Sequence, residues 1–136
     1  MSIVDARRFG VFQYATFADI NDVRVQRYLP TTARYITLEK SAMGHRAKYS
    51  ISESDLRAHL DEQWALRGQY STIPRDKIGD GSIVSEETVA RLFGDLGWTI
   101  PESVTEWHTP VGGNGAGATY FYDPTTGTAF HRAGYW

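Results

Sequence analysis

The chain of 136 residues contains no cysteine. This absence excludes disulfide bonds, thiolate nucleophiles and every cysteine-ligated zinc or iron–sulfur site. No segment approaches the roughly 20 consecutive apolar residues that a membrane-spanning helix needs. Near the N-terminus, Asp5, Arg7 and Arg8 stand where a secretory signal would need its apolar run. We therefore expect a cytoplasmic protein that does not bind membranes.

The chain also has no strong excess of charge of either sign. It contains 14 Lys and Arg against 16 Asp and Glu, for a net charge of -2, and 41% of its residues are hydrophobic. These values are close to those of soluble globular domains and exclude wholesale disorder. Domains commonly contain about 100–150 residues, so we expect one globular domain spanning residues 1–136.

Sequence signals for metals and cofactors are missing as well. None of the four histidines forms an H-x-x-x-H or H-E-x-x-H pair, the spacings that place two imidazoles on one metal ion. The glycine-rich segment Gly112–Ala118 has a weak G-x-G-x-x-A match to a dinucleotide-binding loop. Such a loop needs a strand before it and a helix after it. Here Pro110 precedes and the β-rich Thr119–Tyr122 follows, so we expect neither a metal nor a cofactor.

Hydrophobic alternation predicts an antiparallel sheet. Residues 9–17 are aromatic-rich and favour a strand, whereas residues 18–29 fit either a helix or a strand. One hairpin is expected over 33–39 and 46–51, with Gly44 in its connection. A second joins 119–122 to 128–132 through an Asp-Pro-x-x-Gly turn. The intervening residues 98–111 contain two prolines and are expected to be irregular or a short edge strand.

Two helices complete the expected fold. The first begins after the capping Ser52, buries Leu56, Leu60 and Trp64 on one stripe, and ends near Gly68. The second begins after Ser85 and ends near Gly97, with a stripe formed by Val89, Leu92, Phe93 and Leu96. This order is not a βαβ alternation. It predicts an α+β fold in which an antiparallel sheet of about four to six strands carries two amphipathic helices on one face.

The C-terminal region has the composition of a binding surface. It is rich in glycine and in aromatic residues, which are enriched in interface anchors, and glycine allows a partner to approach closely. We therefore expect a non-catalytic binding module whose partner is another protein or a second copy of the chain. The predicted binding residues are Gly113, Gly115, Gly117, Tyr120, Tyr122, Tyr135 and Trp136.

Three other functions stay open at this point. A small metal-independent hydrolase or nuclease could use Glu106, His108, His131 and Arg132, which combine acid–base groups with a phosphate-binding cation. A compact chain with an aromatic tail also fits a structural subunit of a larger assembly. Nucleic acid could bind a basic hairpin, although the chain as a whole is slightly acidic. The residues of that hairpin are Arg34, Arg46, Lys48, Tyr35 and Tyr49.

Overall fold

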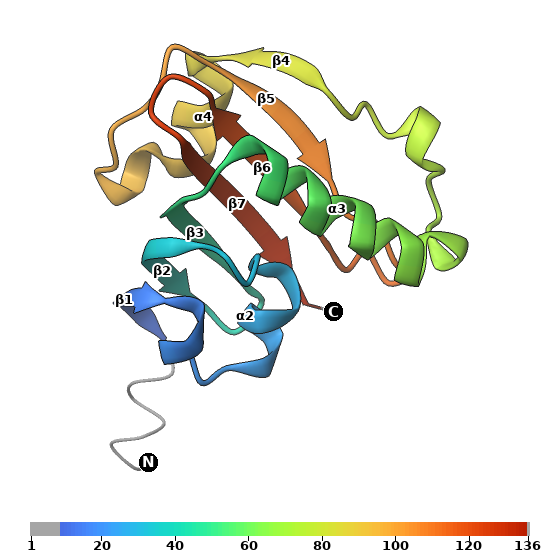
Figure 1. Cartoon of the computed structure of the whole chain (residues 1–136), viewed down its shortest axis with the longest axis horizontal. Coiled ribbons are helices and arrows are strands. Elements are labelled where there is room, and N and C mark those ends of the chain that lie inside the picture. Colours follow the sequence, from blue (N-terminus) through green and yellow to red (C-terminus); the bar gives the residue numbers. More distant parts are fainter. Residues whose placement is uncertain (1–8, 136) are drawn as a thin grey trace.

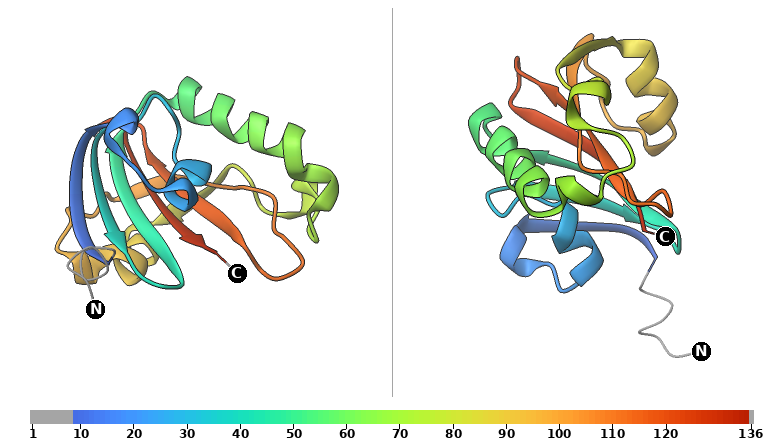
Figure 2. Two further views of the ribbon diagram at one scale, coloured as in Figure 1. Left: turned by 90° about the horizontal axis from the view of Figure 1, so that it is seen from below. Right: turned by 90° about the vertical axis from the view of Figure 1, so that its right-hand side faces the viewer.

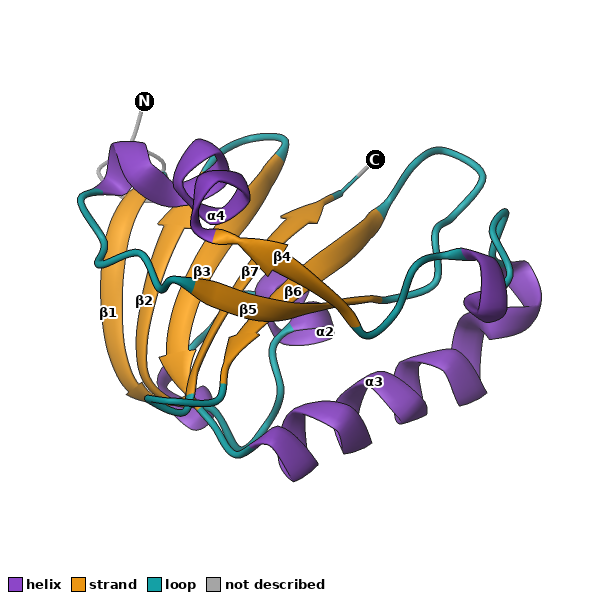
Figure 3. Cartoon of the chain, turned by 90° about the horizontal axis from the view of Figure 1, so that it is seen from above, coloured by secondary structure: helices purple, strands orange, loops and turns teal. Residues whose placement is uncertain are grey.

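The computed structural model of the chain describes residues 9–135, in which seven strands form one antiparallel sheet (Figure 1). The strand order is β1-β2-β3-β7-β6-β5-β4. The strands are β1 (Gly10–Thr16), β2 (Arg34–Lys40), β3 (Gly44–Ser50), β4 (Ser82–Ser85), β5 (Ser103–His108), β6 (Gly117–Asp123) and β7 (Thr128–Gly134). The helices are α2 (Val23–Tyr28), α3 (Glu53–Arg67) and α4 (Glu86–Phe93), with 3₁₀ turns η1 (Phe17–Asp19), η2 (Gly68–Tyr70), η3 (Arg75–Lys77) and η4 (Gly94–Leu96). The sheet is twisted, so that β4 and β5 run across the direction of β1 and β2 (Figure 3).

Both predicted hairpins are present. In β2 and β3 the alternate residues Ile36, Leu38, Ala47 and Tyr49 are buried, as the period-two pattern requires. Gly44 is not in the connection, because it is the first residue of β3.

The connection between β6 and β7 is a turn with local side-chain support. The Asp123 carboxylate accepts hydrogen bonds from the Thr125 amide and the Thr126 hydroxyl, at 3.0 and 2.8 Å. Gly127 then takes a positive φ of 70°, which glycine adopts without strain.

Helix α3 covers one face of the sheet, here called the α3 face. The Ser52 hydroxyl accepts a hydrogen bond from the Asp55 amide and caps the helix. Leu56 and Leu60 are fully buried in the larger hydrophobic core, which also contains Tyr120 of β6. The short helix α2 lies on the same core, and Asp22 caps it by accepting from two backbone amides.

Helix α4 packs on the opposite face, here called the α4 face (Figures 2 and 3). Its Val89 and Phe93 form a second core with Phe121 and Phe130. Phe121 follows Tyr120 in a strand, and successive strand residues point to opposite faces. The prediction that both helices pack on one face is therefore wrong, because each face has apolar residues that need covering.

The sheet is also larger than predicted. The predicted α+β class with an antiparallel sheet is confirmed, but the seven strands exceed the predicted four to six. The edge strand β4 was not predicted. It pairs with β5, which therefore lies inside the sheet, although its segment was expected to be irregular or a short edge strand. The ambiguous residues 18–29 contain the helix α2.

No helix between residues 9 and 135 is long and apolar enough to cross a lipid bilayer.

Candidate functional site

Five polar residues form a continuous row across the α4 face, here called the polar row. In register, His108 of β5 pairs with Thr119 of β6, and Thr119 pairs with Arg132 of β7. Arg132 pairs with Arg46 of β3, and Arg46 pairs with Glu39 of β2. Helix α4 covers the neighbouring phenylalanines on this face, as described above. The polar row therefore lies beside α4.

A groove of about 590 Å³ runs along the polar row. Four glycines line it, and three of them, Gly44, Gly134 and Gly117, are paired with one another across β3, β7 and β6. The fourth, Gly115, comes from the loop before β6 and has a positive φ of 87°. Glycine has no side chain to fill the space, so the sheet is hollow beside the polar row.

At two of these glycines a side chain would crowd the neighbouring backbone. A Cβ atom at Gly44 would lie 2.0 Å from the carbonyl oxygen of Ala133, which backbone pairing cannot accommodate. A Cβ atom at Gly117 would lie 3.1 Å from the carbonyl oxygen of Pro110. The close pairing of strands and loop in this region therefore gives the groove its glycine lining.

Arg46 is neutralised by its neighbours. Its guanidinium donates to Glu39 at 3.0 Å, to both carboxylate oxygens of Asp95 at 2.7 and 3.1 Å, and to the Leu92 carbonyl at 2.9 Å. The hydrogen bonds with Asp95 are the largest cause that raises the pKa of Arg46 above its ordinary value. Arg46 consequently ties β3 to the segment after α4 and has little capacity left for a ligand.

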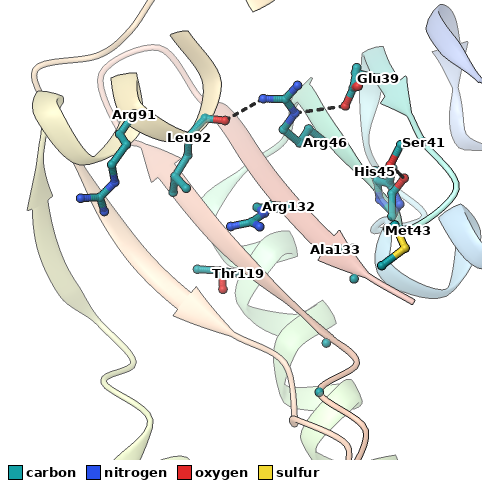
Figure 4. A pocket seen from close by; sticks show the side chains of 14 residues that line it. Glu39, Ser41, Met43, His45, Arg46, Arg91, Leu92, Thr119, Arg132 and Ala133 are labelled. Carbon is teal, nitrogen blue, oxygen red and sulfur yellow. Dashed lines mark hydrogen bonds and ion pairs between the residues drawn. The ribbon is translucent and has the colours of Figure 1, made fainter. Parts of the chain in front are cut away.

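Arg91 and Arg132 line the same groove but, unlike Arg46, are not neutralised by neighbouring carboxylates among the described residues. Both are exposed, and neither guanidinium makes a hydrogen bond or an ion pair with any of residues 9–135. In Figure 4 Arg132 of β7 lies below the paired Arg46, and Arg91 extends from α4 on the other side of Leu92. Each guanidinium presents N–H donors in a rigid planar fork. The groove therefore offers two open cationic donors to a ligand.

The predicted acid–base residues are only partly brought together. His108 lies on the α4 face with Arg132, and its Nε2 is 3.7 Å from Glu106 Oε2 while its Nδ1 is 3.2 Å from Thr119 Oγ1. His131 points to the α3 face and is fully buried. The sheet therefore separates His131 from Glu106, and the two cannot act on one substrate.

His131 belongs instead to a buried histidine–tyrosine chain under α2 and α3. The Tyr135 hydroxyl contacts His45 Nδ1, His45 Nε2 lies 2.6 Å from His131 Nε2, and His131 Nδ1 lies 2.8 Å from the Tyr49 hydroxyl. Between the two facing Nε2 atoms, one nitrogen must donate and the other must accept. The two histidine tautomers are therefore coupled, and all four polar groups are satisfied.

Burial keeps these histidines neutral. Desolvation lowers the pKa of His45 to about 3 and that of His131 well below its ordinary value. His59 of α3 hydrogen-bonds the Tyr28 carbonyl at 3.1 Å, and its pKa is lowered to about 4, also by burial. Removal from water raises the pKa of Tyr49 and Tyr120 well above 10. This cluster is a structural network of neutral groups.

The predicted aromatic surface is not exposed. Tyr120 and Tyr122 share a face as expected, but they lie in the core, where their hydroxyls donate to the carbonyls of Tyr28 and Ile51. Tyr135 is half-buried and holds the chain end by donating its amide to the Met43 carbonyl. Trp136 lies outside the described residues.

The predicted glycines, unlike the predicted tyrosines, do not lie in the core under α3. Gly113 lies in the exposed loop before β6, and Gly115 and Gly117 line the groove. The glycine-rich part of the predicted surface therefore borders the α4 face, whereas its tyrosines pack on the α3 face.

The basic hairpin does not present its five residues together. Tyr49 is buried, Arg46 is neutralised, and Lys48 lies over the Trp98 ring at 5.4 Å. Only Arg34 and Tyr35 are exposed. Of the five residues named for nucleic acid, the hairpin therefore leaves only Arg34 and Tyr35 open to a partner.

Sequence reasoning missed Arg91 and the polar row as a unit. The pairs Gly44 and Arg46, Gly117 and Thr119, and Arg132 and Gly134 each stand two residues apart. This spacing places both members of a pair on one face of a strand, so the sequence held a signal for a row of glycines beside a polar row. Nothing local indicates that Arg91 reaches the same place.

Within residues 9–135, no three His, Cys, Asp or Glu side chains are grouped to hold a metal ion. Comparisons with models of protein families, with curated proteins and with solved structures find no match to this chain.

Proposed function

We propose that this chain is a non-catalytic protein-interaction module and that its binding surface is the groove on the α4 face. The observation that carries this proposal is the pair of open guanidinium groups, Arg91 and Arg132, in a hollow of the sheet. Arginine is among the residues that most often dominate interface energies. A second copy of the chain and an unrelated protein are both compatible with such a surface.

The rest of the groove suits contact with a protein. Met43 is 59% exposed and Leu92 is half-buried, and both line the groove, so apolar contacts stand beside the charged ones. Interfaces commonly combine apolar contacts with arginine contacts. The α3 face, in contrast, is closed by α2 and α3, as described above.

The test first selects peptides that bind the protein and then asks whether a substitution that fills the groove abolishes their binding. Dodecapeptides displayed on phage are selected against the immobilised protein, and the amide shifts that each enriched peptide induces are mapped by NMR. We expect shifts at the groove, binding lost in Thr119→Tyr, which fills it, and binding kept in Thr125→Tyr, a matched change in the exposed β6–β7 turn. Enriched peptides that bind Thr119→Tyr as well as the unaltered protein would refute the proposal.

A hydrolase is the second candidate, because Thr119, His108 and Glu106 are in a contact chain beside Arg132. This order resembles a nucleophile, a base and an orienting carboxylate. Its test is the hydrolysis of p-nitrophenyl acetate and of bis-p-nitrophenyl phosphate. A rate that scales with protein concentration and disappears in His108→Gln, but not in His59→Gln, would favour this candidate over a binding module.

A further inference from the structure

The charges around the groove favour an anionic ligand that carries a carboxylate. Three arginines, Arg46, Arg91 and Arg132, stand against two carboxylates, Glu39 and Asp95, and both carboxylates are bound to Arg46. Arg91 and Arg132 remain without an anion among the described residues. A carboxylate matches the planar guanidinium fork with two parallel hydrogen bonds.

A protein carboxylate fits better than a polyanion. A nucleic-acid strand repeats a negative charge at every nucleotide, and its backbone would be repelled by Glu39, a quarter exposed, and by the exposed Asp95. A single acidic side chain can bind Arg132 while the rest of its segment avoids these carboxylates.

The glycine lining indicates how such a segment would lie. Glycine within a strand often marks a place where another backbone comes close, and here Gly44, Gly134 and Gly117 are neighbours across three strands. Beside them, Met43 and Leu92 offer apolar contact, which a free inorganic anion could not use. The surface is therefore complementary to a peptide segment and not to an ion alone.

We infer that the groove binds an acidic segment of a protein partner, with Asp or Glu carboxylates on Arg132 and Arg91 and the partner's main chain over the glycines. This inference rests on the proposed function and names the chemistry of its partner.

The experiment compares two peptide arrays. Both contain dodecapeptides with randomised flanks, one with a central Glu-x-Glu and one with a central Gln-x-Gln. Binding is measured to the unaltered protein, to Arg132→Gln and to Arg91→Gln. Arg57→Gln is the matched control, since Arg57 is an exposed arginine of α3 on the other side of the sheet. Within residues 9–135 the Arg132 side chain has no partner to lose, so we expect its variant to fold, and its thermal unfolding midpoint checks this.

We expect strong binders in the Glu array only. Arg132→Gln should weaken them by about tenfold or more, a typical effect of losing one well-placed ion pair, and Arg57→Gln by less than about twofold. Changing the central glutamates of one binder to glutamine should weaken its binding to the unaltered protein but hardly to Arg132→Gln. That non-additivity identifies the two groups as partners.

Other outcomes would overturn the inference in distinguishable ways. Binding of Gln peptides that Thr119→Tyr abolishes would refute the acidic partner and leave the interaction module standing. Arg132-dependent binding of oligothymidylate or inorganic phosphate, without binding of Glu peptides, would assign the groove to nucleic acid or to a free anion. Absence of any peptide binding at the groove would refute both proposals.

Discussion

The buried histidines should make this protein sensitive to mild acid. In the folded chain the pKa values of His45 and His59 are lowered to about 3 and about 4, and that of His131 is lowered well below its ordinary value, in each case chiefly by burial. In the unfolded chain an ordinary histidine has a pKa of about 6.5. As the pH falls below that value, the unfolded state takes up protons that the folded state cannot accept. The contribution of these histidines to stability is therefore fully present well above pH 6.5 and is lost progressively below it.

The size of the effect follows from the number of histidines involved. Each contributes a loss of about 1.4 kcal/mol per pH unit below its unfolded pKa. His45 and His131 are almost fully buried, and together they should cost about 3 kcal/mol between pH 7.5 and 5.5. His59 adds about 1 kcal/mol more. The sum of about 4 kcal/mol is a large share of the roughly 5–15 kcal/mol by which domains are stable.

Urea unfolding followed by tryptophan fluorescence at pH 7.5, 6.5 and 5.5 measures this loss. The variant His59→Gln can keep the hydrogen bond to Tyr28 and should reduce the pH dependence by about a third, because it removes one of three titrating histidines. Its stability at pH 7.5 serves as the control for any structural cost of the change. An unfolding free energy that stays constant from pH 7.5 to 5.5 would refute the reasoning. So would NMR titration of His45 or His131 near pH 6.5 in the folded protein.

Two further predictions concern packing. Leu60 is 1% exposed, and Leu60→Ala should lower the unfolding free energy by about 2–5 kcal/mol, because it leaves a cavity under α3. Leu66→Ala, at a residue that is 59% exposed on the same helix, should change it by less than about 0.5 kcal/mol in the same urea titration, and equal effects would contradict this packing. Gly44→Ala should prevent cooperative thermal unfolding, because its Cβ would lie 2.0 Å from the Ala133 carbonyl oxygen. Gly113→Ala, with no atom within 4 Å, should melt like the unaltered protein.

Local features of the sequence were sufficient for the individual elements. Alternation of apolar residues predicted the β2–β3 and β6–β7 hairpins, and the caps Ser52 and Ser85 marked the beginnings of α3 and α4. These signals lie within a few residues of the helix or strand that they specify, so local sequence is enough to predict each of these elements. The short β4 had no such signal, and it is a strand because it pairs with β5.

The candidate site was less predictable, because its parts come from distant segments. Alternation showed that Tyr120 and Tyr122 share a face, but it could not show that α3 covers this face. His108 and Arg132 were identified as a pair of interest, and the sheet register does place both on the α4 face. His131, one residue before Arg132, points the other way.

What the sequence determined by itself is therefore the set of elements and the residues that share a face on each. The tertiary structure alone decided which face each helix covers. The pairing of β3 with β7 brings His45 to His131 on one side and Arg46 to Arg132 on the other. The physical reason is that the free energy of folding depends on the apolar area buried over the whole sheet, to which every element contributes. A strand's periodicity fixes its two faces, but only the packing of every other element determines which face stays open to a partner.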